Sequence, residues 1–126
     1  MYLVNGLTND NIQHATLVVG ENETCDFKLY FCPTQYSWYF DWTYKNISSK
    51  GNKVILSPNI LRYYKHRIPF GLAVLSDDYI PPFKIDDFTT RIGLYILNSE
   101  EVDAIEEDVF NPTNENILLD NKEVRI

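Results

Sequence analysis

Aromatic side chains occupy every even position from residue 36 to residue 44, and the odd positions between them are mostly polar. Successive side chains on a strand point to opposite faces, so the alternation predicts a β-strand with one aromatic face. Covering five such side chains would contribute roughly 20 kcal/mol of gross hydrophobic stabilisation, whereas an open face would exceed the apolar patches of soluble monomers. We therefore expect the face to be core, and Tyr39, on the opposite face, to be the better surface candidate. The stripe consists of Tyr36, Trp38, Phe40, Trp42 and Tyr44.

The neighbouring segments continue the strand pattern. Residues 16–19 and 27–31 are predicted as strands separated by a turn, and Pro33 ends the second of them. After the aromatic strand, the polar residues 45–52 predict a hairpin loop and residues 53–56 its return strand. Connections this short cannot cross over between parallel strands, so the first half of the chain is predicted to be an antiparallel meander.

A helix is expected over residues 58–67. Ser57 is a favoured N-cap residue, and Pro58 would stand at the first helical position, where its missing N–H costs nothing. The apolar residues of this segment fall on one helical face, its cations lie near the C-terminal end, and Pro69 would stop the helix.

Two later segments, residues 70–75 and 91–97, are almost continuously apolar. Strands of this kind are buried on both faces. In a small all-β domain, the second face must be covered by a helix, by another part of the barrel or by a neighbouring subunit. Residues 99–108 are compatible with a short helix, and we expect residues 112–126 to be ordered only if a partner holds them.

Together these segments predict a mainly β fold: a small antiparallel β-barrel of about six strands with one short helix near residues 58–67. The predicted organisation is an N-terminal arm at residues 1–13, the barrel domain at residues 14–105 and an acidic tail at residues 106–126. The expected core residues are Phe27, Leu29, Phe31, Trp38, Phe40, Trp42, Ile60, Leu61, Ile92, Leu94 and Ile96.

Charge is distributed unevenly along the chain. The formal net charge is −7, which would repel a nucleic-acid backbone, so no nucleic-acid specificity is expected. No apolar run is long enough to predict a membrane span. Cations concentrate in residues 62–67 and carboxylates in residues 100–108, which predicts two ends of opposite sign. With Tyr39, the candidate interface residues are therefore Arg62, Tyr63, Lys65, Arg67, Glu100, Glu101 and Asp103.

Catalytic chemistry has little support in the sequence, and we predict no catalytic, cofactor-binding or metal-binding residues. The adjacent pairs Asp77-Asp78 and Asp86-Asp87 lie beside prolines, where such residues usually face solvent or cap turns. The two histidines are isolated, and no glycine-rich phosphate loop is present. Cys25 and Cys32 would point to opposite faces of one strand, so two free thiols are expected and no zinc site.

A series of short motifs follows in order along the predicted strands. The motifs are Phe27-Lys28-Leu29-Tyr30-Phe31, Trp38-Tyr39-Phe40-Asp41, Val54-Ile55-Leu56, Asn59-Ile60-Leu61-Arg62-Tyr63-Tyr64, and Asp86-Asp87-Phe88 before Ile92-Gly93-Leu94-Tyr95-Ile96. Their order resembles that of the small baseplate plug proteins of contractile-tailed phages, over about residues 15–105. Ser57-Pro58 stands where that pattern has a glycine, the turn from residue 46 to 51 is longer than usual, and the chain after residue 106 lies outside the pattern.

This resemblance implies a structural, non-catalytic component of the virion, made in the host cytoplasm and built into the tail baseplate. The implied partners are the hub, spike and tail tube proteins, and the implied assembly is a homo-oligomer, with a trimer favoured. The alternative that the residues leave open is a carbohydrate-binding β-sandwich module, in which Trp38, Trp42 and the tyrosines would stack on sugars.

Overall fold

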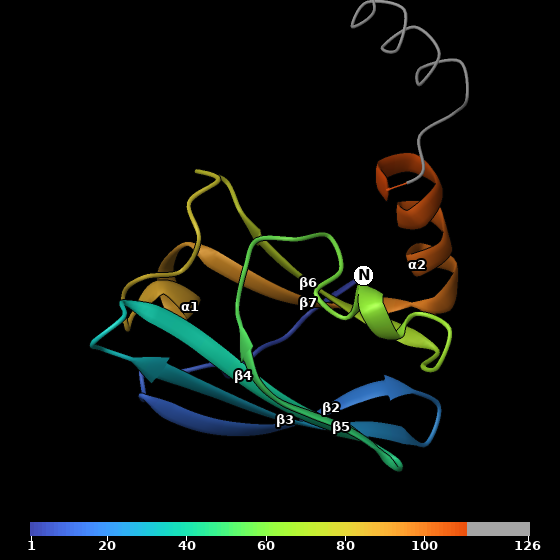
Figure 1. Ribbon diagram of the computed structural model, residues 1–126, viewed down its shortest axis with the longest axis horizontal. Coiled ribbons are helices and arrows are strands. Elements are labelled where there is room, and N and C mark those ends of the chain that lie inside the picture. Colours follow the sequence, from blue (N-terminus) through green and yellow to red (C-terminus); the bar gives the residue numbers. More distant parts are fainter. Residues whose placement is uncertain (111–126) are drawn as a thin grey trace, which may run out of the picture.

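The computed structural model describes residues 1–110 and shows a mainly β protein with two antiparallel sheets (Figure 1). One sheet has three strands in the order β1-β7-β6, and the other has four in the order β2-β3-β4-β5. No helix among residues 1–110 is long and apolar enough to cross a membrane. The elements are β1 (Tyr2–Leu3), β2 (Ile12–Gly20), β3 (Glu23–Cys32), β4 (Ser37–Tyr44), β5 (Ile47–Lys53), the 3₁₀ turn η1 (Arg62–Tyr64), β6 (Phe70–Ser76), α1 (Asp87–Thr90), β7 (Ile92–Asn98), α2 (Ser99–Ile105) and the π-helical turn η2 (Glu106–Phe110).

The predicted antiparallel meander is confirmed as the four-stranded sheet, with neighbouring strands paired in sequence order. Its turns contain residues with positive φ, namely Asn22, Tyr36 and Lys45. Strand β2 is longer than the strand predicted at residues 16–19, because its pairing with β3 begins at Ile12. The N-terminal arm includes the short edge strand β1, which pairs with β7.

Most of the aromatic stripe forms the core. Trp38 and Trp42 are 0% and 1% exposed, and Phe40 and Tyr44 are also buried; we call these four side chains of β4 the aromatic layer. Their rings pack across to the rest of the molecule, with ring centroids 5.2 Å apart for Trp38 and Phe88 and 5.0 Å apart for Trp42 and Tyr64. These edge-on ring pairs tie β4 to α1 and to η1, and a third pair, Tyr44 with Phe70 of β6 at 5.1 Å, ties β4 to the three-stranded sheet.

Tyr36 does not belong to this layer, and its assignment to the stripe was wrong. It lies in the turn before β4, with a φ of 49°, and its side chain is 70% exposed. Residues 33–36 form a turn between β3 and β4, so the alternation of the strand begins only at Ser37. Tyr36 has the spacing of the aromatic layer, but it precedes the strand and its side chain does not share the strand's buried face.

The hairpin after the aromatic layer also differs from the prediction. Its turn comprises only Lys45 and Asn46, and the polar residues 47–53 form strand β5 itself, which pairs with β4. Of the expected return strand at residues 53–56, Lys53 belongs to β5, the Val54 N–H still bonds to β4, and residues 55–56 leave the sheet. A polar strand is possible here because β5 is an edge strand with much of its surface in solvent.

The helix expected at residues 58–67 is not formed; only the 3₁₀ turn η1 is present. The backbone of this segment bonds to β6 instead: Ser57 pairs with Val74, and the Ile60 N–H donates to the Leu72 carbonyl at 2.7 Å. The buried Asn59 side chain accepts from the backbone N–H groups of Leu61 and Leu72. These contacts satisfy the backbone N–H and C=O groups of the extended segment, which a helix would have paired with one another.

Helix α2 covers part of the second face of β6 and β7. Val102 of α2 forms a small buried cluster with Ala73 and Leu97. A side chain at Gly71 would not fit, because a Cβ there would lie 2.8 Å from Asn59 Oδ1 and 2.9 Å from a Val102 methyl group. The helix predicted within residues 99–108 is therefore confirmed, and it supplies a cover that does not require another subunit.

Among residues 1–110, backbone hydrogen bonds join the two sheets on one side only. Beyond β5, the Val54 N–H still donates to the Trp38 carbonyl at 2.8 Å, and the chain then reaches β6 at Ser57. On the other side, between β1 and β2, no strand pairing closes the sheets into a barrel within the described residues. The expected core residues lie between the sheets: most are buried, and Phe31, Ile60 and Ile96 are partly buried against them.

Candidate functional site

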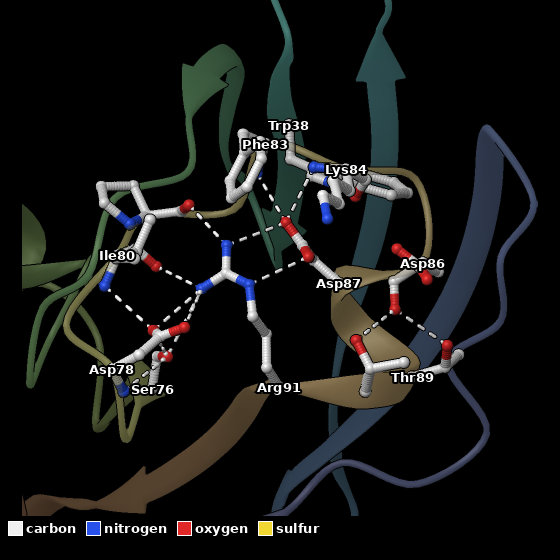
Figure 2. A network of polar contacts seen from close by, with 12 residues as sticks. Trp38, Ser76, Asp78, Ile80, Phe83, Lys84, Asp86, Asp87, Thr89 and Arg91 are labelled. Carbon is white, nitrogen blue, oxygen red and sulfur yellow. Dashed lines mark hydrogen bonds and ion pairs between the residues drawn. The ribbon is translucent and has the colours of Figure 1, made fainter.

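The connection between β6 and β7 is held in place by one arginine, Arg91 (Figure 2). Its guanidinium binds both carboxylate oxygens of Asp87, with Nε to Oδ1 and Nη2 to Oδ2 each at 3.0 Å. Asp87 is only 1% exposed. A buried carboxylate requires such a partner, and the planar fork of arginine provides two parallel hydrogen bonds.

The same guanidinium also holds the far end of this connection. Its Nη1 donates to Asp78 Oδ1 at 3.0 Å and to the Ile80 carbonyl at 2.6 Å, and Nη2 donates to the Pro81 carbonyl at 2.8 Å. In Figure 2, Arg91 lies between Asp87 on one side and Asp78 and Ile80 on the other. We call residues 77–87 the braced loop, because one side chain binds several points along it.

Asp87 links the braced loop to the core. Its Oδ2 accepts from the backbone N–H groups of Phe83, at 2.6 Å, and Lys84, at 2.8 Å. The carbonyl of Lys84 in turn accepts from the indole Nε1–H of Trp38 at 2.9 Å. The loop is thus connected to the aromatic layer through hydrogen bonds as well as packing.

The charge state of Asp78 suits its role as a partner of the Arg91 guanidinium. The Ser76 hydroxyl and then the Ile80 N–H donate hydrogen bonds to its carboxylate and lower the pKa of Asp78, and the charge of Arg91 acts in the same direction. These effects outweigh the small opposing effect of burial. Asp78 is therefore ionised at neutral pH and bound to a cation, which does not suit it to act as a general acid.

Several large apolar side chains on the braced loop are exposed. Tyr79 is 86% exposed at a positive φ of 57°, Ile80 is 48% exposed, and Phe83 and Ile85 are 38% and 42% exposed. Phe83, Ile85 and Tyr36 border a hollow of about 820 Å³. Exposed apolar side chains that are grouped on a fixed loop are typical of a protein contact surface.

The sequence interpretation of the two aspartate pairs was incomplete. Asp78 and Asp87 are structural ligands of one arginine, which the sequence analysis did not single out. The local signal was the spacing from Asp87 to Arg91, an i,i+4 pair across α1. The contact with Asp78 spans 13 residues, so no local pattern indicates it.

The expected separation of basic and acidic ends is wrong. Glu106, in the acidic segment, pairs with Arg62 at 2.8 Å and with Lys65 at 3.1 Å, so the two segments lie against each other. Burial alone would raise the pKa of Glu106, but the hydrogen bonds and charges of Lys65 and Arg62 together lower it. Arg62 also lies over the Phe110 ring, at 4.2 Å from its centroid.

The other candidate interface residues differ in how available they are. Glu101 caps α2 through the Asn98 N–H and pairs with the N-terminal amine at 2.6 Å, so it has a structural role. Tyr39 stacks on Tyr30 on the outer face of the four-stranded sheet, at 6.0 Å between ring centroids. The remaining candidates are exposed: Tyr63, Arg67, Glu100 and Asp103.

The sugar-stacking platform proposed from the tryptophans is not available. Trp38 and Trp42 are covered by Phe88 and Tyr64, so neither ring can contact a ligand in this fold. Cys25 is buried, which raises the pKa of its thiol to about 11, and Cys32 lies at the end of β3. No group of three or more potential metal ligands is present among residues 1–110.

Comparison with known proteins agrees with the family resemblance read from the sequence. No curated protein matches the chain. The model of one protein family, described as the cyanophage baseplate Pam3 plug gp18, matches residues 3–100. The match includes both sheets, the aromatic layer and the braced loop. The chain therefore belongs to the family of the cyanophage baseplate plug protein gp18 of Pam3, a structural component of the phage tail baseplate.

Proposed function

We propose that this protein plugs or joins the central region of the baseplate, where the tail tube meets the hub and spike, and that it does so through the braced loop. The observation that carries the proposal is the exposure of Tyr79, Ile80, Phe83 and Ile85 on a loop fixed by a buried ion pair. The membership in a plug family supports the baseplate setting.

The bracing gives the exposed side chains an advantage in binding. A loop that must be ordered on association loses conformational entropy, whereas a loop held in one conformation avoids much of that cost. Arg91 holds the backbone at Ile80 and Pro81, and Asp87 holds it at Phe83 and Lys84. Aromatic side chains in this setting are typical anchors of protein interfaces.

Charged residues elsewhere on the surface would set the orientation of the contact. Arg67, Glu100 and Asp103 remain exposed. Such groups at the rim of an interface affect the association rate and the register more than the affinity. Arg62 and Lys65 contribute less in this proposal, because Glu106 already neutralises them.

The proposal is tested by measuring binding of the purified protein to the hub protein of the same phage. We expect a variant with both Tyr79→Ser and Phe83→Ser to lose affinity by about 1,000-fold, since two hot-spot side chains at about 2 kcal/mol each contribute about 4 kcal/mol. The matched control is Tyr63→Ser, which removes an equally exposed tyrosine, 91% exposed, from η1.

The control also discriminates between two surfaces. If Tyr63→Ser weakens binding and the loop variant does not, the contact lies at residues 62–67 and the proposal fails. Binding of the hub by wild type and loop variant with equal affinity would exclude the braced loop as the contact. Thermal unfolding of each variant must match wild type, so that a lost interaction is not a lost fold.

A further inference from the structure

The two edges of the four-stranded sheet are built differently. Strand β5, at one edge, carries Lys50 and Lys53 and contains Gly51 at a φ of 71°, and its pairing with β4 shifts register between Phe40 and Trp42. Lysines and irregular pairing are devices that stop an edge from accepting another strand. The β5 edge is therefore protected.

Strand β2, at the opposite edge, has almost none of these devices. It runs for nine residues from Ile12 to Gly20 without lysine, arginine, aspartate, glutamate or proline, and its one irregularity lies between Val18 and Gly20, at its end. Its outward side chains include Ile12, 53% exposed, and Val18, 70% exposed. Among residues 1–110, the side of β2 away from β3 has no strand partner. A long unprotected edge of this kind is a template for another strand.

A groove runs along this free edge, between β2 and the three-stranded sheet, with a volume of about 620 Å³. Tyr2 and Val4 of the N-terminal segment and Ile96 of β7 form one wall, and residues 15–20 of β2 form the other. None of the lining residues carries a charged side chain. The groove lies on the side where the two sheets are not joined, which is where an added strand would bring the fold closer to a barrel.

We propose that the β2 edge pairs with the β2 edge of a second copy of this chain, antiparallel about a two-fold axis. The lack of charged side chains in the groove favours a second copy as the partner. In a two-fold contact the same surface patch of both chains meets, so charged groups in that patch would bring like charges together, and the chain already has a net charge of −7. A strongly charged partner strand would find no complementary group in the groove.

The contrast between the edges also limits the size of the assembly. If both edges were open, a head-to-tail contact would extend into a ring or filament. Because β5 is protected, pairing through β2 stops at two copies and gives one continuous sheet of both four-stranded sheets. This two-fold contact is distinct from the braced loop and from the threefold arrangement that the family resemblance implies, so its test is independent of the proposed function.

The test is sedimentation of the full chain over a wide range of concentrations. We expect a monomer–dimer equilibrium. Val18→Lys should raise its dissociation constant about tenfold or more, because a lysine on the exposed edge opposes the addition of another strand, as the lysines of β5 do. The matched control is Ser48→Lys, which adds the same charge at an exposed position on β5 and should leave the equilibrium unchanged. Circular dichroism of both variants checks that the fold is retained.

Hydrogen exchange of residues 12–20 identifies the occupant. Amides of this strand should become more protected as the dimer forms. A chain that stays monomeric at every concentration overturns the proposal, as does a dimer that Val18→Lys leaves intact. Protection that appears only with the hub protein assigns the edge to a different partner, and protection that is independent of concentration assigns it to a segment of the same chain. Either result excludes the second copy.

Discussion

The aromatic layer and the braced loop fix neighbouring parts of the molecule by different physics. Trp38, Phe40 and Trp42 are buried by the hydrophobic effect, and the two tryptophans pack against Phe88 and Tyr64. The braced loop is held by Arg91 and Asp87, and its large apolar side chains Tyr79, Ile80, Phe83 and Ile85 are exposed. The comparison shows that a small fold can leave part of its apolar surface in solvent, provided that polar bonds keep that surface in place.

The largest effect is expected in the aromatic layer. Trp38→Ala or Phe40→Ala should lower the free energy of unfolding by about 3–5 kcal/mol, because each removes a buried ring and leaves a cavity. Chemical denaturation followed by fluorescence or circular dichroism measures the change. A loss below about 1 kcal/mol at both positions would show that this face does not support the core.

Removing the brace should have the next largest effect. Arg91→Met keeps the apolar stem but leaves the buried Asp87 carboxylate unpaired, and we expect a loss of about 2–3 kcal/mol, below the range for a fully buried pair because Arg91 is partly exposed. Arg91→Lys should lower the free energy of unfolding by a smaller amount, because lysine keeps the positive charge although it lacks the planar guanidinium group that forms two parallel hydrogen bonds.

Hydrogen exchange separates a local from a global effect of Arg91. Faster exchange in residues 77–87 with little change in β3 and β4 would show that the brace acts on the loop. The matched control is Arg67→Met, because Arg67 is exposed and lies 5.9 Å from the Tyr64 ring centroid. A wild-type stability and exchange pattern for Arg91→Met would refute the bracing role.

The pairing of Glu106 with Arg62 and Lys65 predicts a smaller, pH-dependent effect. The pKa of Glu106 is lowered in the folded state from its ordinary value of 4.5, so its stabilising contribution is present above that pH and is lost as the pH falls through the folded pKa. The difference in unfolding free energy between wild type and Glu106→Gln should therefore shrink on acidification. An unchanged difference down to strongly acidic pH would contradict the ion pairs.

The smallest effect is expected at Tyr36, which has the spacing of the aromatic layer but lies outside it. Tyr36→Asn should change the unfolding free energy by no more than about 0.5 kcal/mol, since the side chain is exposed and asparagine tolerates the positive φ of this turn. A loss comparable with that of Trp38→Ala, measured in the same denaturation experiment, would mean that Tyr36 is packed in solution.

Sequence reasoning succeeded where short-range periodicity determines the structure. The alternation in β3 and β4 predicted their pairing and the burial of all four members of the aromatic layer, and continuous apolar runs predicted β6 and β7. It failed at residues 47–67, where tertiary contacts decide: β5 is polar because it is an edge, and residues 57–60 extend because β6 supplies their hydrogen bonds.

The candidate site was only partly accessible from sequence. The aspartate pairs were visible, but their convergence on Arg91 depends on how the loop folds back over 13 residues. The segments at residues 62–67 and 100–108 were assigned to opposite ends because the sequence does not show that η2 returns to η1. Residues 111–126, which include most of the predicted tail, lie outside the described part of the chain.

The most direct test of the central claim is the amount of this protein in baseplates purified from phage that carry Tyr79→Ser and Phe83→Ser. We predict that the variant still folds but is depleted from the baseplates, because the exposed side chains of the braced loop make the contact. Quantitative mass spectrometry of the particles measures the ratio to the hub protein. Wild-type incorporation of the folded variant would contradict the account.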